Sequence, residues 1–288
     1  MKITAIGLCC VGLIYSLLSL AEYTIIFQLI PIWYQVGNHY TKGGVIWILI
    51  YHCFITLTIT SHLRSMFSNP GYTPTMQVPD SVPLEHLSYC DNCQQWKPQR
   101  THHCHICKKC VHKMNHHCPW ICNCIGAKTQ KSFILLLAYS FILNGITLFI
   151  ILSSICFAMQ AQNYNLDENL FIILLSAFIS LFASLYLVFS GFLLYDQLLI
   201  IINNQTEIEK RNNKIAITTS IYENFKTVLG SHITSWWNPL TEIPDPDYTE
   251  EIVTQIKVEK FQIKRIWIVL GISFVLIFSL FATIINMI

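Results

Sequence analysis

The sequence predicts an all-α polytopic membrane protein with a four-helix transmembrane core, a fifth C-terminal span and a small cytoplasmic zinc-bound cysteine-rich domain. Hydrophobic residues make up 53% of the 288 residues, charged residues only 12%, and the mean hydropathy is +0.48. A water-soluble domain has about 25% charged residues, so this chain lacks the polar side chains that a water-facing surface requires. The same composition excludes a disordered, collagen-like or coiled-coil chain. The net charge of +2 does not indicate a nucleic-acid partner, and we expect none.

Five apolar stretches are long enough to cross a bilayer, which takes about 20 residues in a helix. They cover residues 4–30, 43–63, 132–159, 170–202 and 266–288. The first stretch follows Lys2, as in a secretory signal peptide, but it continues far past the apolar length of such a peptide, so we expect a span. Asp196, near the end of the fourth stretch, is expected in the headgroup layer; the alternative is a functional carboxylate within the membrane.

The 18 Lys and Arg residues indicate how the spans are oriented. Eight lie between the second and third stretches, eight lie between the fourth and fifth, and only Lys2 and Lys42 lie elsewhere. Because cytoplasmic connectors carry the excess of basic residues, we expect both large connectors and the N-terminus in the cytoplasm and the C-terminus outside. The predicted organisation is two spans in 1–63, a cytoplasmic cysteine-rich zinc domain in 64–131, two spans in 132–202, a cytoplasmic segment in 203–265 and a last span in 266–288.

Cysteine and histidine are concentrated between positions 90 and 124, where eight of the 12 cysteines and six of the 11 histidines lie. A disulfide framework is one interpretation, but the cytoplasm keeps thiols reduced. Repeated Cys-x2-Cys pairs with interspersed histidines are instead typical of zinc ligands, and bound metal would supply the folding energy that this polar segment lacks. Two tetrahedral sites need eight ligands, and the segment offers fourteen. A remaining cysteine beside a histidine is a candidate nucleophile; alternatively, the extra residues are spare thiols and surface histidines.

Two longer motifs carry a resemblance to a known family. They are Lys97-Pro98-x-Arg100-x-His102-His103-Cys104 and Met114-Asn115-His116-His117-Cys118-Pro119-Trp120. The segment that contains them closely resembles the cysteine-rich domain of DHHC-type protein S-acyltransferases (palmitoyltransferases), which lies between spans two and three on the cytoplasmic side in that family. Weaker similarities to family motifs occur at Asn69-Pro70-Gly71, at Thr206-Glu207-Ile208-Glu209 and from Asn224, the counterpart of a buried Asn, to Pro239.

The resemblance implies a role for each ligand and for the reactive residues. It implies two structural zinc sites, one formed by Cys90, Cys93, His103 and Cys110 and the other by Cys104, Cys107, His117 and Cys124. Cys118 then has the place of the nucleophile that carries the acyl group as a thioester, His116 has that of its general base, and Asn115 stands where the motif has Asp.

The implied reaction moves a long-chain acyl group from acyl-CoA (palmitoyl-CoA) to Cys118 and then to a cysteine of a membrane-associated substrate protein. Membrane lipids are the other expected partners, because burying the acyl chain among the spans contributes about 0.8 kcal/mol per methylene. Candidates for binding the CoA phosphates are basic residues of the same segment, each of which could instead face solvent or lipid headgroups. They are Lys97, Arg100, Lys108, Lys109 and Lys128. The sequence does not indicate an organelle.

Two other functions stay open from the sequence. One is a catalytically weak or inactive zinc-bearing membrane adaptor of the same fold, which the Asn in the motif would suit. The other is a transporter or channel, although the spans hold few ionisable residues, among them Glu22, His52 and Asp196.

The chain departs from the family pattern at Asn115, at Thr129, at Glu207 and through the extra thiol of Cys122. The amide oxygen of Asn115 can still accept a hydrogen bond and orient His116, but it brings no negative charge to stabilise the protonated ring. This predicts an active but slow enzyme that Asn115→Asp would accelerate. Cys122 is a bystander, an auxiliary acylation site or an alternative metal ligand.

Overall fold

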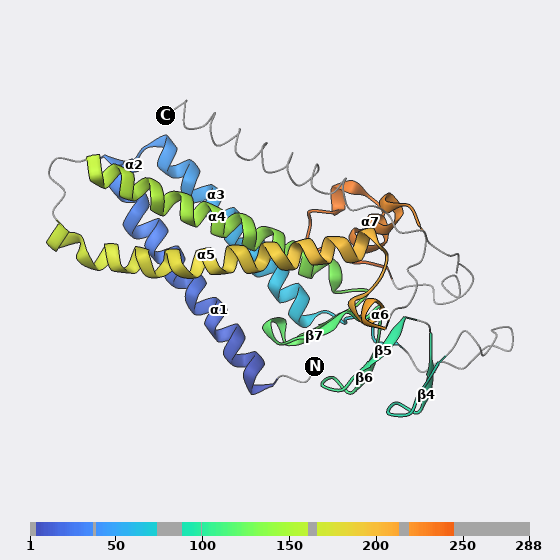
Figure 1. The fold of residues 1–288 in the computed structure, drawn as a ribbon. Helices are drawn as coiled ribbons and strands as arrows, with labels where there is room; N and C mark the ends of the chain where they lie inside the picture. Colours follow the sequence, from blue (N-terminus) through green and yellow to red (C-terminus); the bar gives the residue numbers. More distant parts are fainter. Residues whose placement is uncertain are drawn as a thin grey trace.

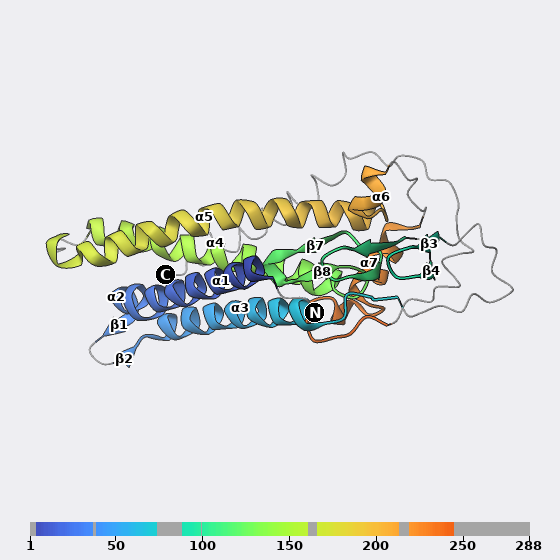
Figure 2. The same ribbon diagram turned by 90° about the horizontal axis from the view of Figure 1, so that it is seen from below.

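The computed structural model describes residues 4–36, 39–73, 88–98, 100–160, 166–212 and 219–244. Long helices run side by side, and the hairpins of residues 88–125 gather at one end of the bundle, opposite the short hairpin of residues 35–40 (Figure 1, Figure 2). Among the described residues, four helical segments are long and apolar enough to cross a membrane. The expected fifth span at 266–288 lies outside the described residues.

The first span combines three consecutive helical segments, α1 (Ala5–Tyr23), the π-helical η1 (Thr24–Leu29) and α2 (Ile30–Tyr34). Thr4 caps α1 through its side chain, which accepts a hydrogen bond from the Gly7 amide. A short hairpin of β1 (Gln35–Val36) and β2 (His39–Tyr40) follows. The helix therefore runs beyond the predicted end at residue 30.

The other spans are α3 (Lys42–Phe67), α4 (Gln130–Gln160) and α5 (Leu166–Ile202). Each extends past the apolar stretch that predicted it, because apolar length marks only the part of a helix that lies within the lipid. Helix α4 packs between α3 and α5. The core between the helices includes Ile25, Tyr51, Leu143, Ile150 and Ile179, and the Tyr51 hydroxyl shares a hydrogen bond with Thr147 across α3 and α4.

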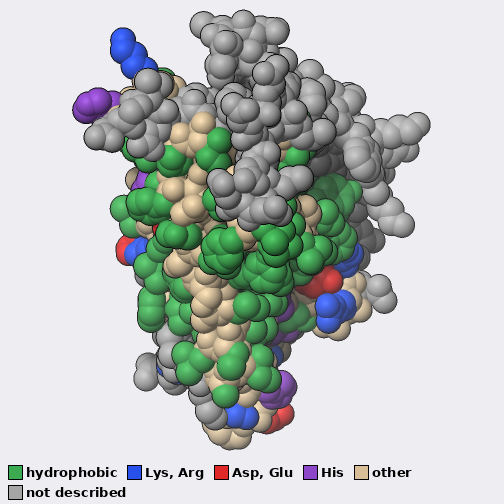
Figure 3. Space-filling model, turned by 90° about the vertical axis from the view of Figure 1, so that its left-hand side faces the viewer, with side chains coloured by type: hydrophobic (Ala, Val, Ile, Leu, Met, Phe, Trp, Pro, Cys, Tyr) green, Lys and Arg blue, Asp and Glu red, His purple; other side chains and the backbone are tan. Residues whose placement is uncertain are grey.

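Large apolar side chains also cover the outside of the bundle. Phe171 and Val188 of α5 are 70% and 73% exposed, and Ile6 of α1 is 71% exposed. On the face shown in Figure 3, described hydrophobic side chains dominate and charged ones lie at the margins. A continuous apolar surface of this kind is stable in lipid and not in water, which agrees with a membrane protein.

Three antiparallel hairpins follow α3, each made of two short strands. They are β3 (Ser88–Cys90) with β4 (Gln95–Lys97), β5 (Thr101–Cys104) with β6 (Lys109–His112), and β7 (His116–Cys118) with β8 (Asn123–Ile125), the last pair joined by the 3-10 turn η3 (Pro119–Ile121). A lone two-stranded hairpin is marginally stable in water. Something other than strand pairing must therefore stabilise this module.

The segment after α5 contains α6 (Glu207–Arg211), α7 (Ile221–Leu229) and the short turn η4 (Ile233–Ser235). Asn224 of α7 is buried, and its Nδ2 donates to the Ile202 carbonyl at the end of α5 at 3.2 Å. The expected buried Asn is confirmed, and it attaches α7 to the end of the fourth span.

Candidate active site and metal centres

The first predicted ligand set lies where the β3–β4 and β5–β6 hairpins meet. Cys90 ends β3, Cys93 lies in the turn after it, and His103 and Cys110 face each other across the β5–β6 pair. The Nδ1 atom of His103 lies 3.2 Å from the Cys93 sulfur, 3.7 Å from that of Cys90 and 4.0 Å from that of Cys110. Four potential ligand atoms therefore surround one point.

The second predicted set has the same form, one hairpin further along the chain. Cys104 and Cys107 lie at the β5 end and in its turn, and His117 pairs with Cys124 across β7 and β8. The His117 Nδ1 atom lies 3.7, 3.4 and 3.5 Å from the sulfurs of Cys104, Cys107 and Cys124. The β5–β6 hairpin thus contributes to both sets, which couples the two sites mechanically.

Both clusters have the dimensions of a tetrahedral metal site. Zn–S bonds of about 2.3 Å and Zn–N bonds of about 2.0 Å give tetrahedral edges of roughly 3.5–3.8 Å, and within each set all ligand atoms lie within 4.8 Å of one another. Gln94 and Lys108, each directly after the second cysteine of a Cys-x2-Cys pair, have φ of +52° and +57°. These left-handed residues close the turns that bring two thiols together. All twelve cysteines are described and none forms a disulfide, so the disulfide interpretation is wrong.

Cys118 ends strand β7 and belongs to neither metal cluster. It is buried in an apolar cluster with Ile121, Phe133 and Leu136. Burial raises the pKa of the Cys118 thiol to about 11, although its sulfur accepts hydrogen bonds from the backbone amides of Trp120 and Ile121, which favour the thiolate. The thiol is therefore protonated at neutral pH and needs a base in order to react.

His116 lies two residues before Cys118 on the same strand. Because alternate residues of a strand point to the same face, His116 and Cys118 share one face of β7, while His117 between them faces the metal cluster. Burial lowers the pKa of His116 and the charges of His117 and Arg211 lower it further, whereas the Glu207 carboxylate raises it. Since the net pKa lies below the ordinary value, the ring is neutral at neutral pH and can accept a proton.

Asn115 is buried, and its amide oxygen makes no hydrogen bond to His116 among the described residues. Its Oδ1 atom instead accepts a hydrogen bond from the backbone amide of Glu207 at 3.1 Å. Asn115 thus joins the start of β7 to the first residue of α6.

Arg100 forms a buried ion pair with Glu209 instead of facing acyl-CoA, so its prediction as a phosphate ligand is wrong. Its Nε and Nη2 atoms donate to the two carboxylate oxygens of Glu209 at 2.7 and 3.0 Å, and both side chains are 8% exposed. Glu209 also completes a capping box with Thr206 at the start of α6. The pair therefore fixes α6, and with it Glu207, against the metal-binding module.

An apolar cavity of about 330 Å³ lies among the spans, and part of its lining comes from residues close to Cys118. Leu136 both lines the cavity and belongs to the apolar cluster that contains Cys118, and Trp120, whose amide faces the Cys118 sulfur, also lines it. Tyr15 and Tyr186 contribute polar atoms from α1 and α5. The cavity has the polarity that a long acyl chain requires.

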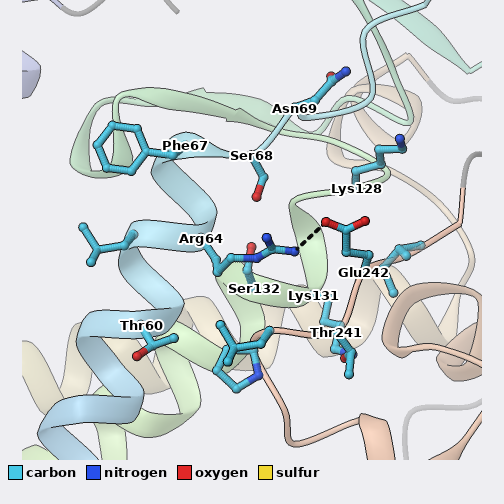
Figure 4. A pocket seen from close by; sticks show the side chains of 14 residues that line it. Thr60, Arg64, Phe67, Ser68, Asn69, Lys128, Lys131, Ser132, Thr241 and Glu242 are labelled. Atoms are coloured by element: carbon cyan, nitrogen blue, oxygen red, sulfur yellow. Dashed lines mark hydrogen bonds and ion pairs between the residues drawn. The ribbon is translucent and has the colours of Figure 1, made fainter.

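A second cavity, of about 610 Å³, is polar and lies at the ends of α3 and α4 beside the segment 239–243. Figure 4 shows Arg64 extending toward Glu242, 3.5 Å away, with Lys128 and Lys131 around the same space. Neither Cys118 nor His116 lines either cavity, and the two cavities share no lining residue. Lys128, one of the candidates for a CoA phosphate, therefore faces a space separate from the apolar cavity.

Comparison with known proteins decides the family. The family model described as DHHC palmitoyltransferase matches residues 84–214, a range that contains β3 to β8 and α4 to α6. Palmitoyltransferase ZDHHC7 of Rattus norvegicus is 31% identical over 259 residues, which cover 81% of this chain and 78% of the relative. This chain belongs to the DHHC palmitoyltransferase family.

Two further relatives extend the similarity to other organisms. Palmitoyltransferase ZDHHC3-A of Danio rerio is 28% identical over 287 residues (88% of this chain, 87% of the relative), and the probable protein S-acyltransferase 12 of Arabidopsis thaliana is 26% identical over 257 residues (82% and 87%). As a DHHC family member, the chain is a protein S-acyltransferase, and the alternative of an inactive adaptor is not favoured.

Two polar residues that the sequence analysis did not single out attach the DHHC segment to the spans. His62 of α3 hydrogen-bonds Tyr15 through Nδ1 (3.1 Å) and the Trp120 carbonyl through Nε2 (3.0 Å). The Asn123 Nδ2 donates to the carbonyls of Ser65 and Ser68 at the end of α3. The sequence could have indicated a structural role for His62, because a histidine within an apolar stretch needs polar partners.

Packing around Cys122 is tight. A Cβ atom added at Gly7 of α1 would lie 2.5 Å from the Cys122 sulfur, and Cys122 is buried outside both metal clusters. These contacts favour a packing role for Cys122 over that of a metal ligand.

Replacing Glu209 with Gln is expected to destabilise this DHHC protein by about 3 kcal/mol, because Arg100 would remain buried without its carboxylate. Burial raises the pKa of Glu209, but the hydrogen bonds and charge of Arg100 outweigh burial and hold it below the ordinary value of 4.5. A lowered folded pKa contributes stability that is present above the ordinary value and is lost as the pH falls through the folded one. As the pH falls from neutral to acidic, the stability of Glu209→Gln should therefore decrease less than that of the wild type.

Thermal unfolding in detergent from neutral to acidic pH checks both expectations. The matched control is Glu223→Gln, which removes an exposed pair with Lys226 and should leave the melting temperature unchanged. Equal melting temperatures for wild type and Glu209→Gln at neutral pH would contradict the role of the buried pair.

Proposed function

We propose that this protein S-acyltransferase works in two steps, with Cys118 as the acyl carrier and His116 as its general base. The observation that carries the proposal is the position of Cys118. It is a thiol outside both metal clusters, on the same strand face as His116, in an apolar cluster that shares Leu136 with the lining of the apolar cavity. An acyl-CoA thioester, palmitoyl-CoA in the simplest case, fits this arrangement as donor because thioester exchange between sulfurs needs no other activation.

In the first step, His116 takes the proton of the Cys118 thiol as the sulfur attacks the thioester carbonyl carbon. A bond forms between that carbon and the Cys118 sulfur, the bond to the CoA sulfur breaks, and the CoA thiolate receives the proton from His116. In the second step, His116 takes the proton of the substrate cysteine, whose sulfur attacks the acyl carbon. The Cys118 thiolate leaves and recovers a proton from His116.

Zinc is the metal that best suits both clusters, each of which offers three cysteines and one histidine at tetrahedral spacing. With four protein ligands a site is closed, so the two ions would be structural. They would supply the folding energy of the three hairpins and hold β7 in place. Strand β7 carries His117 as a ligand directly between His116 and Cys118, so the metal would position both reactive residues.

The acyl chain is proposed to occupy the apolar cavity between Tyr15, Trp120 and Tyr186. Each methylene buried there would contribute about 0.8 kcal/mol. The uneven distribution of Lys and Arg supports a multi-pass topology with the hairpins and active site on the cytoplasmic face. Lys97, Lys108 and Lys109 of the hairpins remain candidates for the CoA phosphates, and membrane-associated proteins with an accessible cysteine are the proposed acceptors.

The proposal is tested by incubating the purified protein in detergent with labelled palmitoyl-CoA. Release of free CoA should accompany label on the protein, one for one, and hydroxylamine should remove that label because it cleaves thioesters. A protein that retains its metal yet releases no CoA and carries no label would contradict the proposed function.

A further inference from the structure

Two departures from the family motifs contact each other in the folded protein. Asn115 stands where the DHHC motif has Asp, and Glu207 stands where the motif after the fourth span has its second Thr. They lie 92 positions apart, yet the Glu207 amide donates to the Asn115 Oδ1 atom at 3.1 Å. Compared with the family motifs, this contact therefore lacks a carboxylate at position 115 and has an additional one at position 207.

Both side chains also have a buried polar atom without a hydrogen-bond partner among the described residues. These atoms are the Asn115 Nδ2, which is a donor, and the Glu207 Oε2, which is an acceptor. A buried polar atom without a partner is costly, and it commonly marks a site where another group binds during function. Both orphaned atoms belong to residues joined by a hydrogen bond at the start of β7.

The hydrogen bond to Asn115 holds Glu207 against the residue directly before the reactive histidine. The Glu207 carboxylate interacts electrostatically with His116 and with Asp196 near the end of α5, and its Oε1 atom lies 3.5 Å from the Nε of Arg211. The Arg211 side chain is 77% exposed, so water largely screens that pair. The Glu207 charge therefore remains available to the groups on β7.

A simpler explanation is that Glu207 only stabilises the N-terminus of α6, where an acidic residue interacts favourably with the helix dipole. Helix α6 has five residues, and Glu209 with Thr206 already forms its capping box. The simpler explanation accounts neither for the contact with Asn115 nor for the burial of the Glu207 Oε2 atom.

We infer that Glu207 is the acidic positioning residue of this active site. Its carboxylate supplies the negative charge beside His116 that the motif Asp would otherwise supply, and Asn115 connects it to β7. The inference rests on the proposed roles of Cys118 and His116. It also changes the expectation for Asn115→Asp, because a second carboxylate beside Glu207 would repel the first instead of accelerating the reaction.

The test compares single-turnover acylation of Cys118 by saturating palmitoyl-CoA among variants matched for zinc content and melting temperature. We expect Glu207→Gln and Glu207→Thr each to slow acylation about tenfold, a smaller loss than the about 10⁴ known for Asp→Asn in a serine-protease triad. The double variant Asn115→Asp/Glu207→Thr restores the motif charge at position 115 and should recover a rate within about threefold of wild type. Glu223→Gln is the matched control and should acylate at the wild-type rate.

The rescue separates positioning from a structural role, since a carboxylate moved to position 115 would not replace a lost cap of α6. Wild-type rates in Glu207→Gln, or no recovery in the double variant, would overturn the inference while leaving the proposed function in place. If Glu207→Gln does not fold, the acylation rate of the double variant is compared with that of Asn115→Asp alone. This comparison also shows whether a carboxylate at position 115 can replace the one at position 207. Absence of acyl-enzyme in the wild type would instead contradict the proposed function, and the inference with it.

Discussion

Cys118→Ser is expected to abolish the acyl-enzyme while leaving the metal content unchanged. Serine keeps the shape of the buried side chain within its apolar cluster, but its hydroxyl is a far weaker nucleophile than a thiol with a neighbouring base. Because Cys118 belongs to neither metal cluster, the hairpins should stay folded. The measurement is hydroxylamine-sensitive label per chain, with zinc determined on the same sample.

The control for this variant is Cys156→Ser, which alters an exposed cysteine of the third span and should retain full labelling. Label must be assigned by peptide, because other cysteines of the spans can also be acylated. Undiminished thioester label in Cys118→Ser, assigned to any other cysteine, would refute the role of Cys118.

The second large effect is expected from Cys104→Ala, which should lose metal and stability together. Cys104 lies beside His103 on β5, the strand that contributes to both clusters. Structural zinc contributes on the order of 10 kcal/mol to the folding of small zinc modules, far more than short hairpins can replace. Metal analysis should find about two zinc ions in the wild type and at most about one in the variant, with a lower melting temperature.

Cys122→Ala provides the matched control, because Cys122 is a buried cysteine of the same module outside both clusters. It should retain both ions. An active wild-type protein with a single zinc or none, or a Cys104→Ala variant with full metal content, would contradict the proposed ligand sets.

Apolar length predicted the four described spans, and the family resemblance divided eight ligands into the two groups that the fold brings together. Apolar length decides whether a helix can cross a bilayer, so the four described spans appear where the apolar stretches are, with ends shifted by capping residues such as Thr4 and Thr41. The grouping of ligands depended on the family resemblance, because spacing alone left fourteen candidates for eight positions.

Contacts between distant segments could not be predicted in the same way. Arg100 and Glu209 are 109 positions apart, and Asn115 and Glu207 are 92 apart. Each of these side chains looks like an ordinary solvated polar residue until the fold places its partner beside it. That is why Arg100 was proposed as a ligand of the CoA phosphates although it is buried against Glu209.

The most direct test of the two-step account follows the acyl group through the wild-type protein. Limiting labelled palmitoyl-CoA is added first, an acceptor protein with an accessible cysteine is added second, and acylated peptides are quantified over time. The account predicts that the Cys118 peptide gains the label first and then loses it as the acceptor cysteine gains an equal amount. Label that reaches the acceptor without ever residing on Cys118, or that stays on Cys118 while the acceptor is acylated, would contradict it.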